Sequence, residues 1–325
     1  MSSNVFDVIL LTALPASGKS EVRSFLANVG KERLQKEFHI GENLQLDDFP
    51  YVNFMRLIDT ALAENGAERI FYASDEDPFY DSRDWGTLIQ LLNEDYHRLL
   101  NREKLSSASP AKTLFERIDR AAMAVGIPPR LEKLDDALIA KIAETLDQEA
   151  LRIQHLTEDQ YTEDMSDKTI IIELSRGGHD GASFPLQNTE GYQYSLPLFS
   201  PDLLHHAAVL YIRVDPEESR RKNAARFDPN DPQSSLHHMT PVKVMLNDYG
   251  CDDMPYLIEH SRKPDSIMLN CYGETIDLPV GVFDNRTDQT TFLREDPSGW
   301  DPERIQNVSD SLRKAADAMW AGYQH

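Results

Sequence analysis

Short apolar runs recur along the chain and alternate with longer stretches whose hydrophobic residues return every three or four positions. Such runs are typical of buried strands in a parallel sheet, and the longer stretches are typical of amphipathic helices. The alternation predicts an α/β fold in which helices cover both faces of a mainly parallel sheet. The apolar runs lie near residues 7–12, 43–46, 169–174, 207–214 and 280–284.

Between the second and third runs the pattern is almost entirely helical. Residues 54–65 are amphipathic, a further helix starts at Asp84, and residues 111–157 indicate two helices separated by a Gly-Ile-Pro-Pro break. We expect a helical insertion over about 85–165 within a single domain of residues 1–325. Near the C-terminus, residues 267–279 suggest a hairpin or an edge element, and residues 302–321 a closing amphipathic helix.

The first apolar run leads into the sequence Ala-Leu-Pro-Ala-Ser-Gly-Lys-Ser, residues 13–20, and then into a helical pattern. A tight loop at the start of a helix points several backbone N–H groups at one spot, which favours binding of an anion such as phosphate. The alternative is an ordinary strand-to-helix turn of an α/β fold.

This stretch resembles the Walker A motif of the P-loop NTPases, although Ala13 stands where the motif opens with Gly. The resemblance implies a three-layer P-loop fold with a helical insertion that uses ATP and Mg²⁺. It implies that Gly18 lets the backbone approach the phosphates, that Lys19 reaches the β- and γ-phosphates, and that Ser20 holds Mg²⁺. The nucleotide-binding residues so implied are Leu14, Pro15, Ala16, Ser17, Gly18, Lys19, Ser20 and Glu21.

Two carboxylates, Asp47 and Asp48, follow the second apolar run. In open α/β sheets the ligand crevice lies at the carboxyl ends of the strands, where these residues are expected. The Asp-Asp-Phe sequence looks like that of the uridine-kinase and phosphoribulokinase type. That resemblance implies a base that orients and deprotonates the accepting hydroxyl. The alternative is a solvated acidic turn or a helix N-cap.

The third apolar run ends in Glu173 and is followed by a glycine-containing segment with Arg176 and His179. A hydrophobic strand ending in an acid resembles Walker B, and a Glu followed by an Arg is similar to deoxynucleoside kinases. The resemblance implies that Glu173 assists Mg²⁺, directly or through water, and that Arg176 contacts a phosphate or the acceptor. We interpret His179 as an ordinary polar loop residue.

The fourth run leads through Asp215-Pro216 into a helix with the densest basic cluster of the chain. Many P-loop kinases carry arginines on a helix that closes over ATP, and the resemblance implies such a lid over about 215–245. Arginines suit this task because their planar fork binds phosphate oxygens bidentately and neutralises charge on the transferred group. The alternative is a solvated helix face paired with Glu217 and Glu218. The cluster consists of Arg220, Arg221, Lys222 and Arg226.

The composition of the chain disfavours some classes of binding partner. The chain of 325 residues has 55 acidic and 33 basic residues, a formal net charge of -22, which disfavours extended nucleic acid and anionic membranes as partners. Two cysteines cannot form a disulfide framework. No run approaches the length of a membrane span and no signal-type segment is evident, so we expect a soluble cytoplasmic protein. We find no internal repeat.

The sequence therefore favours an ATP-dependent phosphotransferase acting on a small molecule, with a nucleoside or nucleotide as one acceptor class. Lys19 and the loop amides would hold the phosphates, Ser20 the Mg²⁺, and Asp48 or Asp47 would act as base. Arg220, Arg221 and Arg226 would close over the γ-phosphate. An NTP-hydrolysing switch and a catalytically silent nucleotide-binding protein remain open. A kinase that acts on polynucleotides or on proteins would use the same loop, but the acidic surface disfavours extended nucleic acid as its substrate. The sequence does not distinguish ATP from GTP as the nucleotide.

Overall fold

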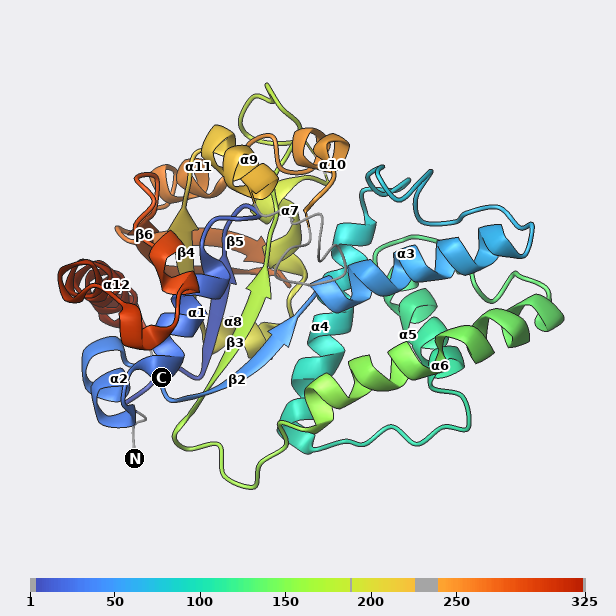
Figure 1. The fold of residues 1–325 in the computed structure, drawn as a ribbon, viewed down its shortest axis with the longest axis horizontal. Coiled ribbons are helices and arrows are strands. Elements are labelled where there is room, and N and C mark those ends of the chain that lie inside the picture. Colours follow the sequence, from blue (N-terminus) through green and yellow to red (C-terminus); the bar gives the residue numbers. More distant parts are fainter. Residues whose placement is uncertain (1–3, 188, 226–238, 324–325) are drawn as a thin grey trace. The chain divides into compact units, whose positions relative to one another are not determined.

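A computed structural model describes residues 4–187, 189–225 and 239–323 of the chain. It contains two compact units, shown with their elements in Figure 1. None of the described helices is both long and apolar enough to cross a membrane. The first unit consists of Met1–Leu44, Asp164–Gln193 and Pro201–His325, and the second of Gln45–Glu163 and Tyr194–Ser200.

The first unit is organised around a sheet of six strands in the order β2-β3-β1-β4-β6-β5. β1 pairs in parallel with β3 and β4, and β4 pairs in parallel with β6. β5 and β6 form the antiparallel hairpin expected near residues 267–279. The expected α/β class with a mainly parallel sheet is therefore confirmed. The strands are β1 (Val8–Thr12), β2 (Glu42–Asp47), β3 (Lys168–Leu174), β4 (Ala207–Arg213), β5 (Ser266–Cys271) and β6 (Glu274–Asp284).

The register places the ends of the three central strands side by side. Thr12, the last residue of β1, lies opposite Leu174 of β3 and opposite Tyr211 of β4. Parallel strands end at the same edge of a sheet, so the loops that follow β1, β3 and β4 leave from one place. That edge positions the candidate site described below.

Alternation along β1 assigns its side chains to two faces, because successive residues of a strand point in opposite directions. Ile9 and Leu11 join one apolar cluster with residues of α1, α2 and α12, while α8 contacts the sheet at β4 and β6. The helices of this unit are α1 (Lys19–Asn28), α2 (Lys31–Phe38), α8 (Pro201–His205), α9 (Pro216–Ala225), α10 (Val242–Asn247), α11 (Met254–Glu259) and α12 (Pro302–Gly322). Two 3-10 turns, η2 (Thr291–Arg294) and η3 (Pro297–Gly299), precede α12, and α7 (Gly191–Ser195) begins in this unit.

Local sequence explains where several helices start. Ser109, Asp135 and Asp301 each accept a hydrogen bond from a backbone N–H in the first turn of α5, α6 and α12. Pro110 and Pro302 follow two of these caps, at positions where the missing N–H costs nothing. α5 and α12 begin within one residue of the expected positions, whereas α6 begins only at Asp136, several residues after the expected Gly-Ile-Pro-Pro break.

The second unit is helical and begins earlier than expected. The sequence predicted an insertion over about 85–165, but the unit starts at Gln45 and includes the helix that follows β2. That helix, α3, packs against α6, and the rings of Phe54 and Phe115 lie 6.1 Å apart. Periodicity could show that α3 has an apolar face but not which partner would cover it. The unit contains α3 (Phe49–Glu64), α4 (Asp84–Asn101), α5 (Pro110–Ala124), α6 (Asp136–Glu158) and the 3-10 turn η1 (Leu196–Leu198).

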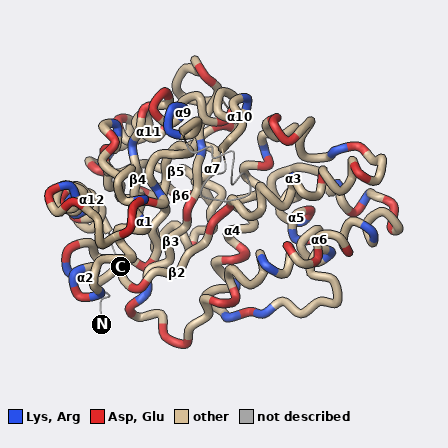
Figure 2. Tube along the Cα trace, viewed as in Figure 1, with Lys and Arg blue, Asp and Glu red and all other residues tan. Residues whose placement is uncertain are grey.

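Charge is distributed unevenly. Figure 2 shows acidic residues over both units, whereas α9 carries a run of basic ones. Most ion pairs lie at the surface, where a pair typically contributes less than about 1 kcal/mol. The acidic surface is therefore better understood as a property that selects partners than as a source of stability.

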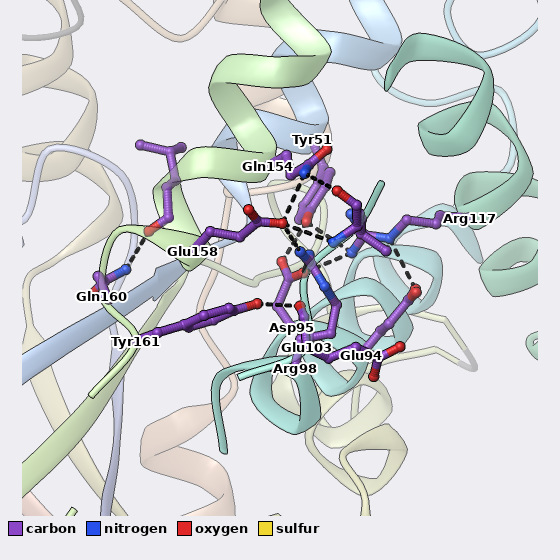
Figure 3. A network of polar contacts seen from close by, with 12 residues as sticks. Tyr51, Glu94, Asp95, Arg98, Glu103, Arg117, Gln154, Glu158, Gln160 and Tyr161 are labelled. Carbon is purple, nitrogen blue, oxygen red and sulfur yellow. Dashed lines mark hydrogen bonds and ion pairs between the residues drawn. The ribbon is translucent and has the colours of Figure 1, made fainter. Parts of the chain in front are cut away.

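The helical unit contains a buried polar network, drawn in Figure 3. The carboxylate of Asp95 accepts hydrogen bonds from Tyr51, from Arg117 Nη2 at 2.7 Å and from Arg98 Nη1 at 3.1 Å. Arg98 also reaches Glu158 at 3.1 Å. Burial raises the pKa of Tyr51, which therefore stays neutral and donates. The charges face one another inside the unit, so the network joins α3, α4, α5 and α6.

The helical unit also contains an internal repeat that the sequence analysis missed. Asp59 of α3 accepts hydrogen bonds from three successive backbone N–H groups, those of residues 70–72, at 2.7–3.2 Å. Asp119 of α5 does the same for residues 130–132, at 2.8–3.2 Å. Gly66 and Gly126, each seven residues after its Asp, have φ of 75° and 81°. The same carboxylate-filled loop is thus built twice, sixty residues apart.

Candidate functional site

Residues 13–20, here called the β1–α1 loop, form a tight connection between β1 and the first turn of α1. Gly18 has φ of 107°, a conformation that L side chains rarely adopt. A Cβ atom at Gly18 would also lie 2.5 Å from Thr290 Oγ1 and 2.7 Å from Asn285 Nδ2. Both the backbone angle and the space therefore require glycine at this position.

Ala13 lies outside the left-handed region, whereas Ala16 has φ of 55°. The chain thus tolerates Ala13 at the opening of the motif because no positive φ is needed there. Ala16 bears the strain instead, which for an L-residue costs roughly 1–2 kcal/mol. Leu14 is fully buried behind the loop. Strain of this kind persists only where surrounding contacts fix the backbone.

Three such contacts hold backbone carbonyls of the β1–α1 loop. Their donors come from α7, from α9 and from the segment after β6, which are far apart in the sequence. Every second residue is held, so three carbonyls point toward the protein. The bonds run from Tyr192 OH to Ala13 O (3.1 Å), from Ser219 Oγ to Pro15 O (2.6 Å) and from Asn285 Nδ2 to Ser17 O (2.6 Å).

Several hydrogen-bond donors of the same loop, in contrast, are not bound by the described protein residues. Within the part of the chain that the structure describes, the backbone N–H groups of Ala16, Gly18 and Ser20 make no hydrogen bond. The hydroxyls of Thr12 and Ser17 are buried and likewise have no partner among the described residues. Buried polar groups are normally paired, so unpaired donors gathered in one loop point to a ligand with acceptor oxygens.

Lys19 extends from the start of α1 across the end of β3. Its Nζ lies 2.5 Å from Ser175 Oγ and 3.9 Å from Glu173 Oε1. The other carboxylate oxygen of Glu173 lies 2.7 Å from Arg23 Nη1. The acid at the end of β3 is therefore brought to the loop, as expected, but between two cations.

The segment after β3 is tightly packed rather than open. Gly178 pairs with Cys251 through two backbone hydrogen bonds of 3.1 Å, and a Cβ at Gly177 would lie 2.3 Å from Cys251 O. The buried Arg176 guanidinium donates to Ser175 O at 2.7 Å. His179 pairs with Glu190 at the surface. The backbone of Cys251 approaches Gly177 too closely for a side chain, which explains the glycine at that position.

Sequence analysis did not single out two adjacent acids, the buried Asp253, which binds α7, and the partly buried Asp252, which binds β4. Asp253 accepts hydrogen bonds of 2.8 Å from the N–H groups of Tyr192 and Gln193, and Asp252 accepts one of 2.9 Å from Tyr211 OH. Burial, followed by the adjacent charge of Asp253, raises the pKa of Asp252 to about 7. Burial raises the pKa of Asp253 to about 6. Their only sequence signal was an acidic pair beside apolar residues.

The basic residues of α9 do not act as one group. Arg221 pairs with Glu218 at 2.7 Å on the surface, as the alternative interpretation expected, and Arg220 lies 3.5 Å from Asp180. Lys222, by contrast, is buried and pairs with Asp288 at 2.7 Å. Arg226 and most of the expected lid segment between α9 and α10 lie outside the described residues.

The remaining candidate residues have defined surroundings. Glu21 pairs with Arg294 at 2.5 Å on the side of α1. Asp47 ends β2 and accepts a hydrogen bond of 2.9 Å from the N–H of Phe49, and Asp48 is buried at the start of α3. Both Asp residues belong to the helical unit and are described within it. Asp47 thus has the local bonding of an acidic turn.

No cluster of three or more His, Cys, Asp or Glu side chains among the described residues could hold a metal ion. The chain matches no protein-family model, and searches of curated proteins and of solved structures also find no match. A functional interpretation therefore depends on the residues of the β1–α1 loop and their surroundings.

Proposed function

We propose that the β1–α1 loop binds the phosphates of a nucleoside triphosphate, and that the protein is an ATP-dependent phosphotransferase acting on a small molecule. One observation carries the proposal: the carbonyls of the loop are held by the protein while its N–H groups at Ala16, Gly18 and Ser20 make no hydrogen bond with the described residues. Anionic oxygens are the complement of such donors at a helix start.

Lys19 adds a positive charge beside these donors. Its Nζ is held by Ser175 near the end of β3, where it could exchange a hydroxyl partner for a phosphate oxygen. A Lys and several backbone N–H groups that act together supply mainly positioning and electrostatic stabilisation, which are the main requirements of phosphoryl transfer. A nucleoside or nucleotide is the acceptor class to test first, with Asp48 or Asp47 as base.

The proposal also implies Mg²⁺, which would neutralise phosphate charge when bound. Ser20 is exposed at the start of α1, and its hydroxyl has no partner in the described chain, which fits a direct ligand. Glu173 is already paired with Arg23 and lies near Lys19, so it fits contact through a water better than direct ligation. Mg²⁺ commonly retains several bound waters, which is compatible with direct ligation by Ser20 and contact with Glu173 through a water.

The test is thermal stabilisation by Mg²⁺-ATP and Mg²⁺-GTP, comparing the wild type with Lys19→Ala. A ligand at 100 times its dissociation constant should stabilise the wild type by about 2.7 kcal/mol, and the substitution should remove most of the effect. Lys36→Ala is the matched control, because Lys36 is an exposed lysine of α2 that pairs with Glu32 of the same helix. Absence of a shift in the wild type with either nucleotide would refute the proposal.

Product analysis then separates the reaction classes. Incubation with ATP, Mg²⁺ and a panel of nucleosides and nucleotides should give a phosphorylated acceptor. Release of inorganic phosphate alone would indicate an NTP-hydrolysing switch, and binding without turnover would indicate a catalytically silent nucleotide-binding protein.

A further inference from the structure

Two segments that hold the β1–α1 loop are also joined to each other. Ser219 of α9 holds Pro15 O, and Asn285, in the segment after β6, holds Ser17 O. Three residues after each of these, Lys222 and Asp288 meet in an ion pair of 2.7 Å. We call Ser219, Lys222, Asp288 and Asn285 the clasp.

Three of the four clasp residues are buried, and Asp288 is partly exposed, with 29% of its side chain accessible. Ser219 and Asn285 are 0% exposed and Lys222 is 4% exposed. Asn285 Oδ1 accepts the N–H of Gln289 at 2.7 Å, which determines that its Nδ2 faces Ser17 O. A buried Lys is costly unless it is paired, so the bond to Asp288 is needed to keep Lys222 inside.

The geometry of the peptide bond gives the clasp a consequence for ligand binding. In a trans peptide the carbonyl of one residue and the N–H of the next lie in one plane and point in opposite directions. Holding Pro15 O therefore directs the N–H of Ala16, and holding Ser17 O directs the N–H of Gly18. These are two of the N–H groups that make no hydrogen bond with the described residues.

We infer that the clasp is a positioning device: Ser219 and Asn285 aim the N–H groups of Ala16 and Gly18 at the phosphates, and the Lys222–Asp288 pair keeps the two holders in register. This inference deepens the proposed nucleotide site and rests on it. It also divides the basic residues of α9, because Lys222 acts through the loop while Arg220 and Arg221 remain able to meet a ligand. A released carbonyl could rotate toward the phosphates and would repel them.

The experiment measures Mg²⁺-ATP affinity by titration in Ser219→Ala and Asn285→Asp. Asn285→Asp is nearly isosteric but places a carboxylate oxygen against Ser17 O. We expect each to weaken binding at least tenfold. The matched control is Ser309→Ala, which removes a buried serine of the same unit that accepts from Arg33 at 2.6 Å and does not touch the loop. It should leave affinity within twofold.

Melting without ligand separates positioning from general damage. If Ser219→Ala and Asn285→Asp lower the melting temperature as Ser309→Ala does but keep wild-type affinity, the inference is wrong. A third variant, Lys222→Met combined with Asp288→Asn, removes the ion pair without leaving a lone charge. It should weaken ATP binding several-fold, and unchanged affinity would count equally against the inference.

A second measurement does not depend on nucleotide binding. In the unliganded protein labelled with ¹⁵N at glycine and alanine, Asn285→Asp should shift the Gly18 amide signal and Ser219→Ala that of Ala16, while Ser309→Ala shifts neither. If the wild type does not bind ATP, the proposed function fails, and the clasp is judged by these signals alone. Unmoved signals would overturn it.

Discussion

The loops of the helical unit and the β1–α1 loop use the same backbone groups in opposite ways. In the helical unit, three successive N–H groups are filled by the chain's own carboxylate, Asp59 in one copy and Asp119 in the other. In the β1–α1 loop, by contrast, the backbone carbonyls accept hydrogen bonds from the chain's own side chains. The first arrangement is complete, whereas the second leaves donors directed away from the protein.

The difference shows how a folded chain separates stability from binding. Buried N–H groups that find an acceptor inside the chain contribute to stability and have nothing left for a ligand. Donors that the chain leaves without an acceptor lower its stability slightly, and a ligand can recover that energy. Substitutions in the two kinds of loop should therefore have effects of opposite sign.

The largest effect is expected at Asp59. Asp59→Ala would leave three N–H groups of a buried segment without an acceptor, at about 1–3 kcal/mol each where water cannot replace the carboxylate. We expect the free energy of unfolding, measured with urea, to fall by about 4 kcal/mol. Asp119→Ala should have a similar effect, because its carboxylate binds three equivalent N–H groups. Loss of under about 1 kcal/mol in both would show that these loops do not depend on their carboxylates.

Asp252 offers a sharper test in the first unit, because partial burial destabilises the charged form of its carboxylate. Its pKa of about 7 in the folded protein lies above the value of 3.8 expected when exposed. The unfolded chain then loses its proton first as pH rises, so stability falls between about pH 4 and pH 7 and levels off above. This carboxyl alone should contribute on the order of 4 kcal/mol to that fall.

Asp252→Asn cannot ionise and should flatten this part of the profile, measured as urea unfolding at several pH values. Its oxygen can still accept from Met254 N–H, as Asp252 does at 2.9 Å. Asp310→Asn, at an exposed position of α12, is the control and should keep the wild-type slope. Parallel profiles for wild type and Asp252→Asn would mean that the charge on the Asp252 carboxylate does not lower stability.

Sequence patterns predicted the features of this fold that are encoded locally. The strand, loop and helix from Val8 to Asn28 follow from an apolar run, a glycine that must adopt positive φ, and an amphipathic segment. The same holds for the other central strands, because a short β-branched run has few alternatives. The candidate ligand loop could therefore be located from twenty residues.

The partners of that loop could not be predicted, because they are set by distant packing. Ser219, Tyr192 and Asn285 lie 204, 179 and 268 residues from the carbonyls that they hold. The sequence does not distinguish Lys222 from its basic neighbours, because its burial depends on the packing of distant segments. The boundary of the helical unit was missed for the same reason, since an amphipathic pattern does not identify the surface that will cover it.

The smallest effect, at Ser17, is the most informative because its sign is reversed. The buried Ser17 hydroxyl has no partner among the described residues, so Ser17→Ala should raise the free energy of unfolding without ligand by about 1 kcal/mol. Ser309→Ala, which removes a buried hydroxyl that does have a partner, should lower it by about 1 kcal/mol. Addition of Mg²⁺-ATP should then stabilise Ser17→Ala less than the wild type, because the ligand loses a donor. If Ser17→Ala instead destabilises the unliganded protein as Ser309→Ala does, the hydroxyl serves the fold, and the contrast between a filled loop and an open one fails at this position.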